Sequence, residues 1–137
     1  MVIVEELDEI FDEAEEIVIY NNDVKTLHKA GSPKYSQILE CWNETISSAH
    51  QMPALGVSID DYTRKELKSG LWIEFCFNTV YECCGMPFEK LLIGVQKEYY
   101  GFNLIRYNTE YGYDGRCYYL DLFGKNTNDL YDLLLNI

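Results

Sequence analysis

The feature that most constrains the fold is a change of hydrophobic period at Leu71. From Leu71 to Asn78 apolar and polar residues alternate, which is typical of a β-strand with one buried face. Shorter apolar stretches follow, separated by connections too short for a crossover helix: 91–95, 102–107 and 116–122. Strands joined in this way most simply pair with their chain neighbours, so the sequence predicts an antiparallel meander.

The residues before Leu71 have the period of helices. Over residues 2 to about 21 the apolar side chains fall on one arc of a helical wheel and the acids fill the other, which predicts an amphipathic helix. Caps and periodicity predict three more helices: 33–50 after the N-cap Ser32, a short one over 58–67, and a last one over about 126–136.

The expected fold class is therefore α+β, with N-terminal helices packed on a four-stranded antiparallel meander sheet and with a C-terminal helix. The 137 residues suit one domain. Its parts would be a helical region at about 1–70, a sheet at about 71–123 and the C-terminal helix at about 126–136.

Charge restricts the class of partner. The chain has 23 acidic residues against 11 lysines and arginines, for a net charge of −12, and residues 1–23 hold nine of the acids with no lysine or arginine. A nucleic-acid binder needs a basic surface, and an anionic membrane would repel this one. We expect no direct contact with nucleic acid or membrane and a basic protein as partner; the sequence indicates no oligomeric state.

Two groups of residues are candidates for partner binding. The acidic face of the predicted first helix would steer a cationic partner, although a solvated face that confers solubility explains it as well: Glu5, Glu6, Asp8, Glu9, Asp12, Glu13, Glu15 and Glu16. Tyrosines in and around the last hairpin would anchor the partner, although tyrosine also suits strand packing: Tyr107, Tyr111, Tyr113 and Tyr119.

A polar face of the sheet is a third candidate. Strand alternation places Trp72, Glu74 and Cys76 on one side, and Asp121 has the matching parity on the fourth predicted strand. If the strand register brings Glu74 and Asp121 together, the two carboxylates could do acid–base chemistry. This is the basis of the alternative that the chain is a small enzyme or ligand-binding domain.

Catalytic and metal-binding motifs are missing from the sequence. It has no G-x-S-x-G, no P-loop and no G-x-G-x-x-G, so we expect no catalytic residues and no cofactor. Cys83-Cys84 is a vicinal pair near a turn, and no set of cysteines and histidines has the paired spacing of a zinc site, so we expect no metal. Five cysteines and an N-terminus without the features of a secretory signal favour reduced thiols in the cytoplasm.

These observations favour a non-enzymatic, acidic protein-binding module. A small, acidic α+β protein is similar in kind to the immunity proteins that neutralise nuclease or other toxin domains, as in toxin–antitoxin pairs, and this analogy implies an inhibitor of a basic toxin or nuclease. The other alternative is a nucleic-acid mimic that blocks a DNA- or RNA-binding protein. The mimic would need the acidic track to continue through Asp60, Asp61 or Asp129.

Overall fold

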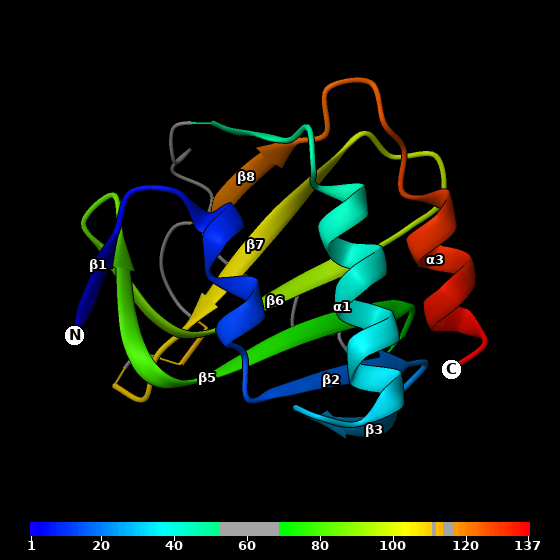
Figure 1. Ribbon diagram of the computed structural model, residues 1–137, viewed down its shortest axis with the longest axis horizontal. Coiled ribbons are helices and arrows are strands. Elements are labelled where there is room, and N and C mark those ends of the chain that lie inside the picture. Colours follow the sequence, from blue (N-terminus) through cyan, green and yellow to red (C-terminus); the bar gives the residue numbers. More distant parts are fainter. Residues whose placement is uncertain (53–68, 111, 114–116) are drawn as a thin grey trace.

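A computed structural model describes residues 1–52, 69–110, 112–113 and 117–137 of the chain (Figure 1). These residues form one eight-stranded sheet, with two α-helices and two 3-10 turns on one of its faces. In chain order the elements are β1 (Val2–Val4), η1 (Leu7–Glu9), η2 (Phe11–Glu13), β2 (Glu16–Asn21), β3 (Val24–Lys29), α1 (Pro33–Thr45), β4 (His50–Met52), β5 (Leu71–Cys83), β6 (Met86–Val95), β7 (Gly101–Tyr107), β8 (Tyr118–Asp121) and α3 (Asn128–Leu135).

The strand order across the sheet is β3-β2-β5-β6-β7-β8-β4, and β1 pairs in parallel with the C-terminal end of β5. The other strand pairs are antiparallel. Between β3 at one edge and β4 at the opposite edge the chain runs across the sheet as α1 (Figure 1). We call the side that carries α1 and α3 the helix-covered face, and the other side the opposite face.

The expected fold class is wrong, because the sheet has eight strands rather than four. The meander itself is present, since β5, β6, β7 and β8 are neighbours in chain order. Strands from the N-terminal part of the chain extend this meander at both edges: β2 and β3 beside β5, and β4 beside β8. The N-terminal region thus contributes four strands to the sheet, β1 to β4, instead of forming a wholly helical layer.

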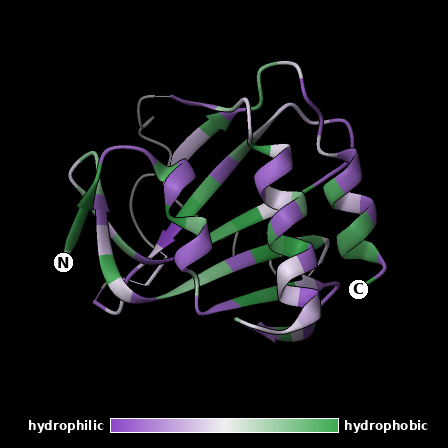
Figure 2. Ribbon diagram, in the orientation of Figure 1, coloured by the Kyte–Doolittle hydropathy of each residue, from purple (hydrophilic) through white to green (hydrophobic). Residues whose placement is uncertain are grey.

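The helix predicted over residues 2–21 is the main error. This segment forms β1, η1, η2 and β2 instead. Acids four residues apart would repel one another along a continuous α-helix, and the β-branched run Ile17–Ile19 favours a strand. The 3-10 turns keep a spacing of three to four residues between buried side chains, so the hydrophobic period resembles that of an α-helix. In Figure 2 hydrophilic and hydrophobic residues alternate at short intervals along this segment.

Val24–Lys29, between the first two predicted helices, forms a strand that was not predicted, β3. Asn22 and Asp23 have φ angles of 49° and 73°, and the register pairs Asn21 with Val24, as in a two-residue type I′ hairpin. Asn and Asp are residues that tolerate this left-handed conformation, so the dipeptide was a hairpin signal. The short helix predicted over 58–67 lies outside the described residues.

The helix predicted after Ser32 is confirmed as α1. The Ser32 Oγ accepts a hydrogen bond from the Tyr35 backbone N–H at 3.2 Å, and Pro33 is the first helical residue. The helix ends at Thr45 instead of extending to His50, because residues 50–52 pair with β8 as the edge strand β4.

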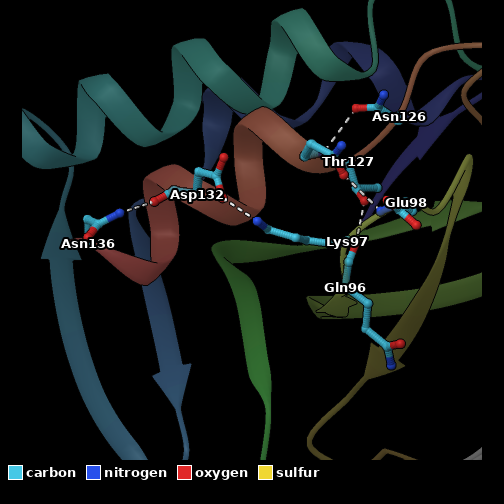
Figure 3. Close-up of polar contacts among 8 residues, drawn as sticks. Gln96, Lys97, Glu98, Asn126, Thr127, Asp132 and Asn136 are labelled. Atoms are coloured by element: carbon cyan, nitrogen blue, oxygen red, sulfur yellow. Dashed lines mark hydrogen bonds and ion pairs between the residues drawn. The ribbon is translucent and has the colours of Figure 1, made fainter.

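The C-terminal helix is also confirmed, as α3. The Thr127 hydroxyl donates a hydrogen bond to the backbone carbonyl of Gln96, and the Lys97 ammonium lies 3.3 Å from the Asp132 carboxylate (Figure 3). These contacts tie both turns of α3 to the β6–β7 connection. Neither helix of the described residues has the length and apolar run needed to cross a membrane.

The core lies between the sheet and the helices. Its centre is a cluster of aromatic rings from four elements: Phe11 of η2, Trp42 of α1, Phe75 of β5 and Phe102 of β7. Ring centroids in the cluster lie 4.8–5.0 Å apart, in the tilted and edge-on arrangements that aromatic pairs prefer. The acidic stretch of the chain is therefore anchored through Phe11 to the centre of the protein.

Candidate functional site

The most strongly charged surface of the described residues is formed by Glu5–Glu16, which we call the acidic segment. Its apolar side chains Leu7, Phe11 and Ala14 are buried, and these anchors turn the intervening carboxylates outward. The predicted docking acids are all present at the surface: Glu5, Glu6, Asp8, Glu9, Asp12, Glu13 and Glu15 are exposed, and Glu16 is half-buried. Each of these acids thus reaches the surface without the predicted helix.

Glu16 stands apart from the other seven acids. It begins β2, where its register partners are Lys29 of β3 and Cys76 of β5. Side chains of paired residues share a face of the sheet, so Glu16 lies with Lys29 on the opposite face. The surface proposed from sequence is therefore made by the seven acids from Glu5 to Glu15.

The charge of these acids is not compensated within the described residues. Asp12 Oδ1 accepts a hydrogen bond from the Asn43 side-chain amide of α1 at 2.8 Å, and no acid of the segment forms an ion pair with any described lysine or arginine. Exposed like charges repel, and this repulsion opposes folding of the segment. Such an arrangement raises the local concentration of cationic molecules.

A hollow opens beside the N-terminal part of the acidic segment. Its volume is about 430 Å³. Its lining residues come from the acidic segment, from β4 and the residue before it, and from β8: Glu5, Glu6, Asp8, Ala49, His50, Gln51 and Leu120. Gln51 Oε1 accepts a hydrogen bond from the Leu7 backbone N–H at 3.1 Å, which fixes the segment to β4.

Three exposed carboxylates lie at the rim of this region. Oxygens of Glu6, Asp8 and Glu9 lie within 4.8 Å of one another. Carboxylate oxygens at this separation could hold a hard cation such as Ca²⁺, and they suit a lysine or arginine side chain equally well. Exposed acids without further ligands are a weak cation site, so we assign them no metal.

An exposed aromatic pair lies next to the hollow, and the sequence analysis missed it. Phe123 is 68% exposed, and its ring centroid lies 4.5 Å from that of His50, which lines the hollow. Its backbone is held in the left-handed region at φ 55°, and its N–H donates to Asp121 Oδ1 at 2.9 Å. A residue with a bulky side chain seldom adopts this backbone conformation. No hydrophobic period in the sequence predicts that the Phe123 ring is exposed here.

Further exposed acids lie on the two helices. Glu40 and Glu44 are exposed one turn apart on α1, and Glu44 lines a shallow hollow together with Asp129 of α3. Burial raises the pKa of the Cys41 thiol most, and the negative charges of Asp129 and Glu44 raise it further. Lys125 also lines this hollow, and its ammonium donates to the Glu44 backbone carbonyl at 3.2 Å, so a lysine stands among these acids. Asp60 and Asp61 lie outside the described residues.

The predicted tyrosine anchors lie on the opposite face, away from the acidic segment. The rings of Tyr107 and Tyr113 pack with centroids 4.9 Å apart, and Tyr119 is the register partner of Asn103 on the same face. All three are half-buried, and Tyr111 lies outside the described residues. A single partner surface could not contact the acids and these tyrosines together, because the sheet separates them.

Glu74 is the buried polar group of the opposite face. Only 1% of it is exposed, and its carboxylate accepts hydrogen bonds from the hydroxyls of Tyr20, at 3.3 Å, and Tyr113. Burial raises the pKa of both tyrosines, and the neighbouring Glu74 charge raises it further. The carboxylate thus ties Tyr113, in the segment after β7, to the sheet.

The carboxylate pair suggested by strand parity is not formed. Glu74 is level with Leu92 and Ile105 in the register, whereas Asp121 is level with Gly101. The two acids are therefore three strands and four residues apart, about 20 Å at ordinary sheet spacings. Strand register decides this point, and the sequence does not specify it.

Comparison of the chain with protein-family models, with curated proteins and with solved structures finds no match.

Proposed function

We propose that this chain is a non-enzymatic protein-binding module that docks a basic protein through the acidic segment. An inhibitor or immunity protein that neutralises a basic toxin or nuclease in the cytoplasm is the form of this function that fits best. The observation that carries the proposal is the surface of seven acids, from Glu5 to Glu15, without a described cationic partner. Uncompensated charge of this kind accelerates association with a cationic target and makes it sensitive to salt.

The hollow beside the segment supports a specific mode of contact. A lysine or arginine side chain of the partner would enter it and meet the carboxylates of Glu5, Glu6 and Asp8. The exposed ring of Phe123, stacked on His50 at the same place, would supply apolar contact area. Steering charge around a rigid aromatic anchor is a common arrangement at tight protein interfaces.

The alternative function, a nucleic-acid mimic, is favoured by one observation. Three more exposed acids lie beyond the acidic segment, Glu40 and Glu44 on α1 and Asp129 on α3, with Lys125 beside Glu44 and Asp129. A mimic needs such a longer track, because the site that it blocks contacts several phosphates in succession. The two functions share the acidic surface and differ in which basic surface of the partner is covered.

The proposal is tested by removing charge from two places. One variant carries Glu6→Gln, Glu9→Gln and Glu13→Gln, and its matched control carries Glu82→Gln, Glu98→Gln and Glu110→Gln, so both have the same net charge. Proteins captured from native lysate at low salt are identified by mass spectrometry, and association rates with the purified partner are then measured at low and high salt. The acidic-segment variant is expected to bind several-fold more slowly at low salt, and the control to match the unmodified chain.

Equal losses of association rate in both variants would show that net charge alone governs binding and would overturn the proposed docking surface.

Competition with nucleic acid distinguishes the inhibitor from the nucleic-acid mimic. If duplex DNA or RNA prevents binding and Asp129→Asn slows it, the mimic is supported; if neither has an effect, the inhibitor without mimicry is supported.

A further inference from the structure

The tip of the β5–β6 hairpin contains an unusual pair of residues. Cys83 and Met86 are register partners, and the two residues between them, Cys84 and Gly85, have φ angles of 57° and 77°. This is the geometry of a type I′ turn, whose first position favours Asn, Asp or Gly. A cysteine with left-handed φ is less stable in this position than glycine, because its Cβ approaches the following carbonyl oxygen. A residue that breaks a local rule in this way points to a role other than stability.

The two thiols converge. The sulfur atoms of Cys83 and Cys84 are 3.6 Å apart, and the Gln51 side-chain amide donates to both, at 3.3 and 3.4 Å. Cys83 is buried and Cys84 is exposed, so the pair is open to solvent on one side. Tyr118 of β8 holds the turn from the other side, because its hydroxyl donates to the backbone carbonyls of Cys83 and Met86.

This geometry suits an ion better than a disulfide. Neighbouring Cα atoms are about 3.8 Å apart across a trans peptide, below the range of about 4.4–6.8 Å that ordinary disulfides span. The sulfurs would also have to close from 3.6 Å to about 2.05 Å. An ion with metal–sulfur bonds of about 2.3 Å, by contrast, would subtend about 100° between sulfurs at the present separation of 3.6 Å.

A third soft donor belongs to the same turn. Met86 lies directly opposite Cys83 in the register, so the two residues share a face of the hairpin. Thiolates and a thioether together select soft cations, and Cu(I) foremost among the common metals. The zinc pattern sought in the sequence requires about four ligands at paired spacings, so it does not detect a site made by three sulfurs in four consecutive residues.

We propose that Cys83 and Cys84, with Met86 as a third donor, form a binding site for a single Cu(I) ion at the tip of the β5–β6 hairpin. Binding forms two copper–thiolate bonds and one copper–thioether bond, and the two thiol protons pass to water, with no change of oxidation state. The proposed copper site does not presuppose the proposed docking function.

One consequence of the site follows from its surroundings, because the Gln51 side-chain amide contacts both thiols. Gln51 also fixes Leu7 of the acidic segment, so copper that displaces the Gln51 amide acts on the anchoring of that segment.

The test uses the reduced, full-length chain without oxygen, titrated against the coloured Cu(I) complex of bicinchoninate. Transfer of copper to the protein removes the colour. The unmodified chain is expected to take one Cu(I), Cys84→Ser to lose at least tenfold in affinity, and Met86→Leu to fall between them. Cys41→Ser and Cys117→Ser, which change thiols elsewhere in the fold, are expected to leave the affinity unchanged.

Cys84→Gly distinguishes the loss of a copper ligand from the loss of the folded structure. Glycine suits the left-handed turn position, so this variant should be at least as stable as the unmodified chain and should still lose copper. Copper uptake by Cys84→Gly equal to that of Cys41→Ser would overturn the proposal. A second result would also overturn the proposal. Mass spectrometry after mild peroxide treatment would then show that Cys83 and Cys84 form a disulfide with each other more readily than they bind copper.

Discussion

The buried carboxylate of Glu74 gives the sharpest test of how this sheet is held together. Its two partners are the hydroxyls of Tyr20 and Tyr113, and the Tyr20 bond is long, at 3.3 Å. Replacing Tyr113 by Phe leaves a carboxylate that is 1% exposed with one weak hydrogen bond. Water cannot reach it freely to compensate, so the lost bond counts almost in full.

The expected size of this effect follows from general values. A hydrogen bond to a carboxylate contributes about 1.5–3 kcal/mol, and leaving the acceptor unsatisfied moves the cost toward the upper part of that range. We expect Tyr113→Phe to lower the free energy of unfolding by about 2 kcal/mol. For a urea m-value of about 2 kcal/mol/M, the midpoint moves by about 1 M.

The cost should also depend on pH. The pKa of Tyr113 is raised in the folded state above its unfolded value, so the folded state holds the proton more tightly. The contribution of the Tyr113 hydroxyl to the free energy of unfolding is complete below about pH 10, the pKa of tyrosine in the unfolded chain. Above that pH the contribution declines by about 1.4 kcal/mol per pH unit. Phenylalanine does not titrate, so the difference in stability between the unmodified chain and Tyr113→Phe should narrow between pH 10 and 11.

The assay is equilibrium unfolding in urea at pH 8, 10 and 11, with Tyr107→Phe as the control. The Tyr107 ring packs against Tyr113 at a centroid distance of 4.9 Å, and its hydroxyl makes no hydrogen bond within the described residues. Tyr107→Phe therefore keeps the ring packing and removes a hydroxyl of little consequence. The reasoning is refuted if both variants cost the same at pH 8, or if the cost of Tyr113→Phe does not shrink above pH 10.

Two further predictions concern the fold. Trp42→Ala empties the centre of the aromatic cluster and should lower the free energy of unfolding by about 3–5 kcal/mol in the same urea assay; a loss below about 1 kcal/mol would mean that the cluster does not form. Ser32→Ala removes the cap of α1 and should cost about 1 kcal/mol, whereas Ser36→Ala, at an exposed position of the same helix, should stay within about 0.5 kcal/mol; equal losses would argue against the cap.

Sequence reasoning succeeded where the signal is local. Ser32 with Pro33 marks a helix start because both act on the first turn of that helix, and the alternation after Leu71 marks a strand because each residue meets one face or the other. The outward direction of the acids from Glu5 to Glu15 was also predicted, although the helix was not formed. A spacing of three to four residues between anchors such as Leu7 and Phe11 turns the acids outward in 3-10 turns as well as in an α-helix.

Sequence reasoning failed where partners lie far apart in the chain. The β-branched run Ile17–Ile19 favours a strand locally, but β2 also pairs with β5, some 55 residues later, and no pattern within Glu16–Asn21 indicates that partner. The same holds for the candidate sites. The separation of Glu74 from Asp121, the stacking of His50 on Phe123 and the placement of the tyrosines behind the sheet all depend on strand order and register.

What the sequence determined by itself is the polarity of each position: which side chains leave water, and where the negative charge gathers. Transfer of an apolar side chain from water is favourable in any backbone conformation that buries it, so this information survives an error in the secondary structure. Only the tertiary structure decided which buried surfaces meet. Hydrogen bonds between distant strands select the register, and a shift of one residue would move Glu74, Tyr113 and the thiols of Cys83 and Cys84 away from their partners.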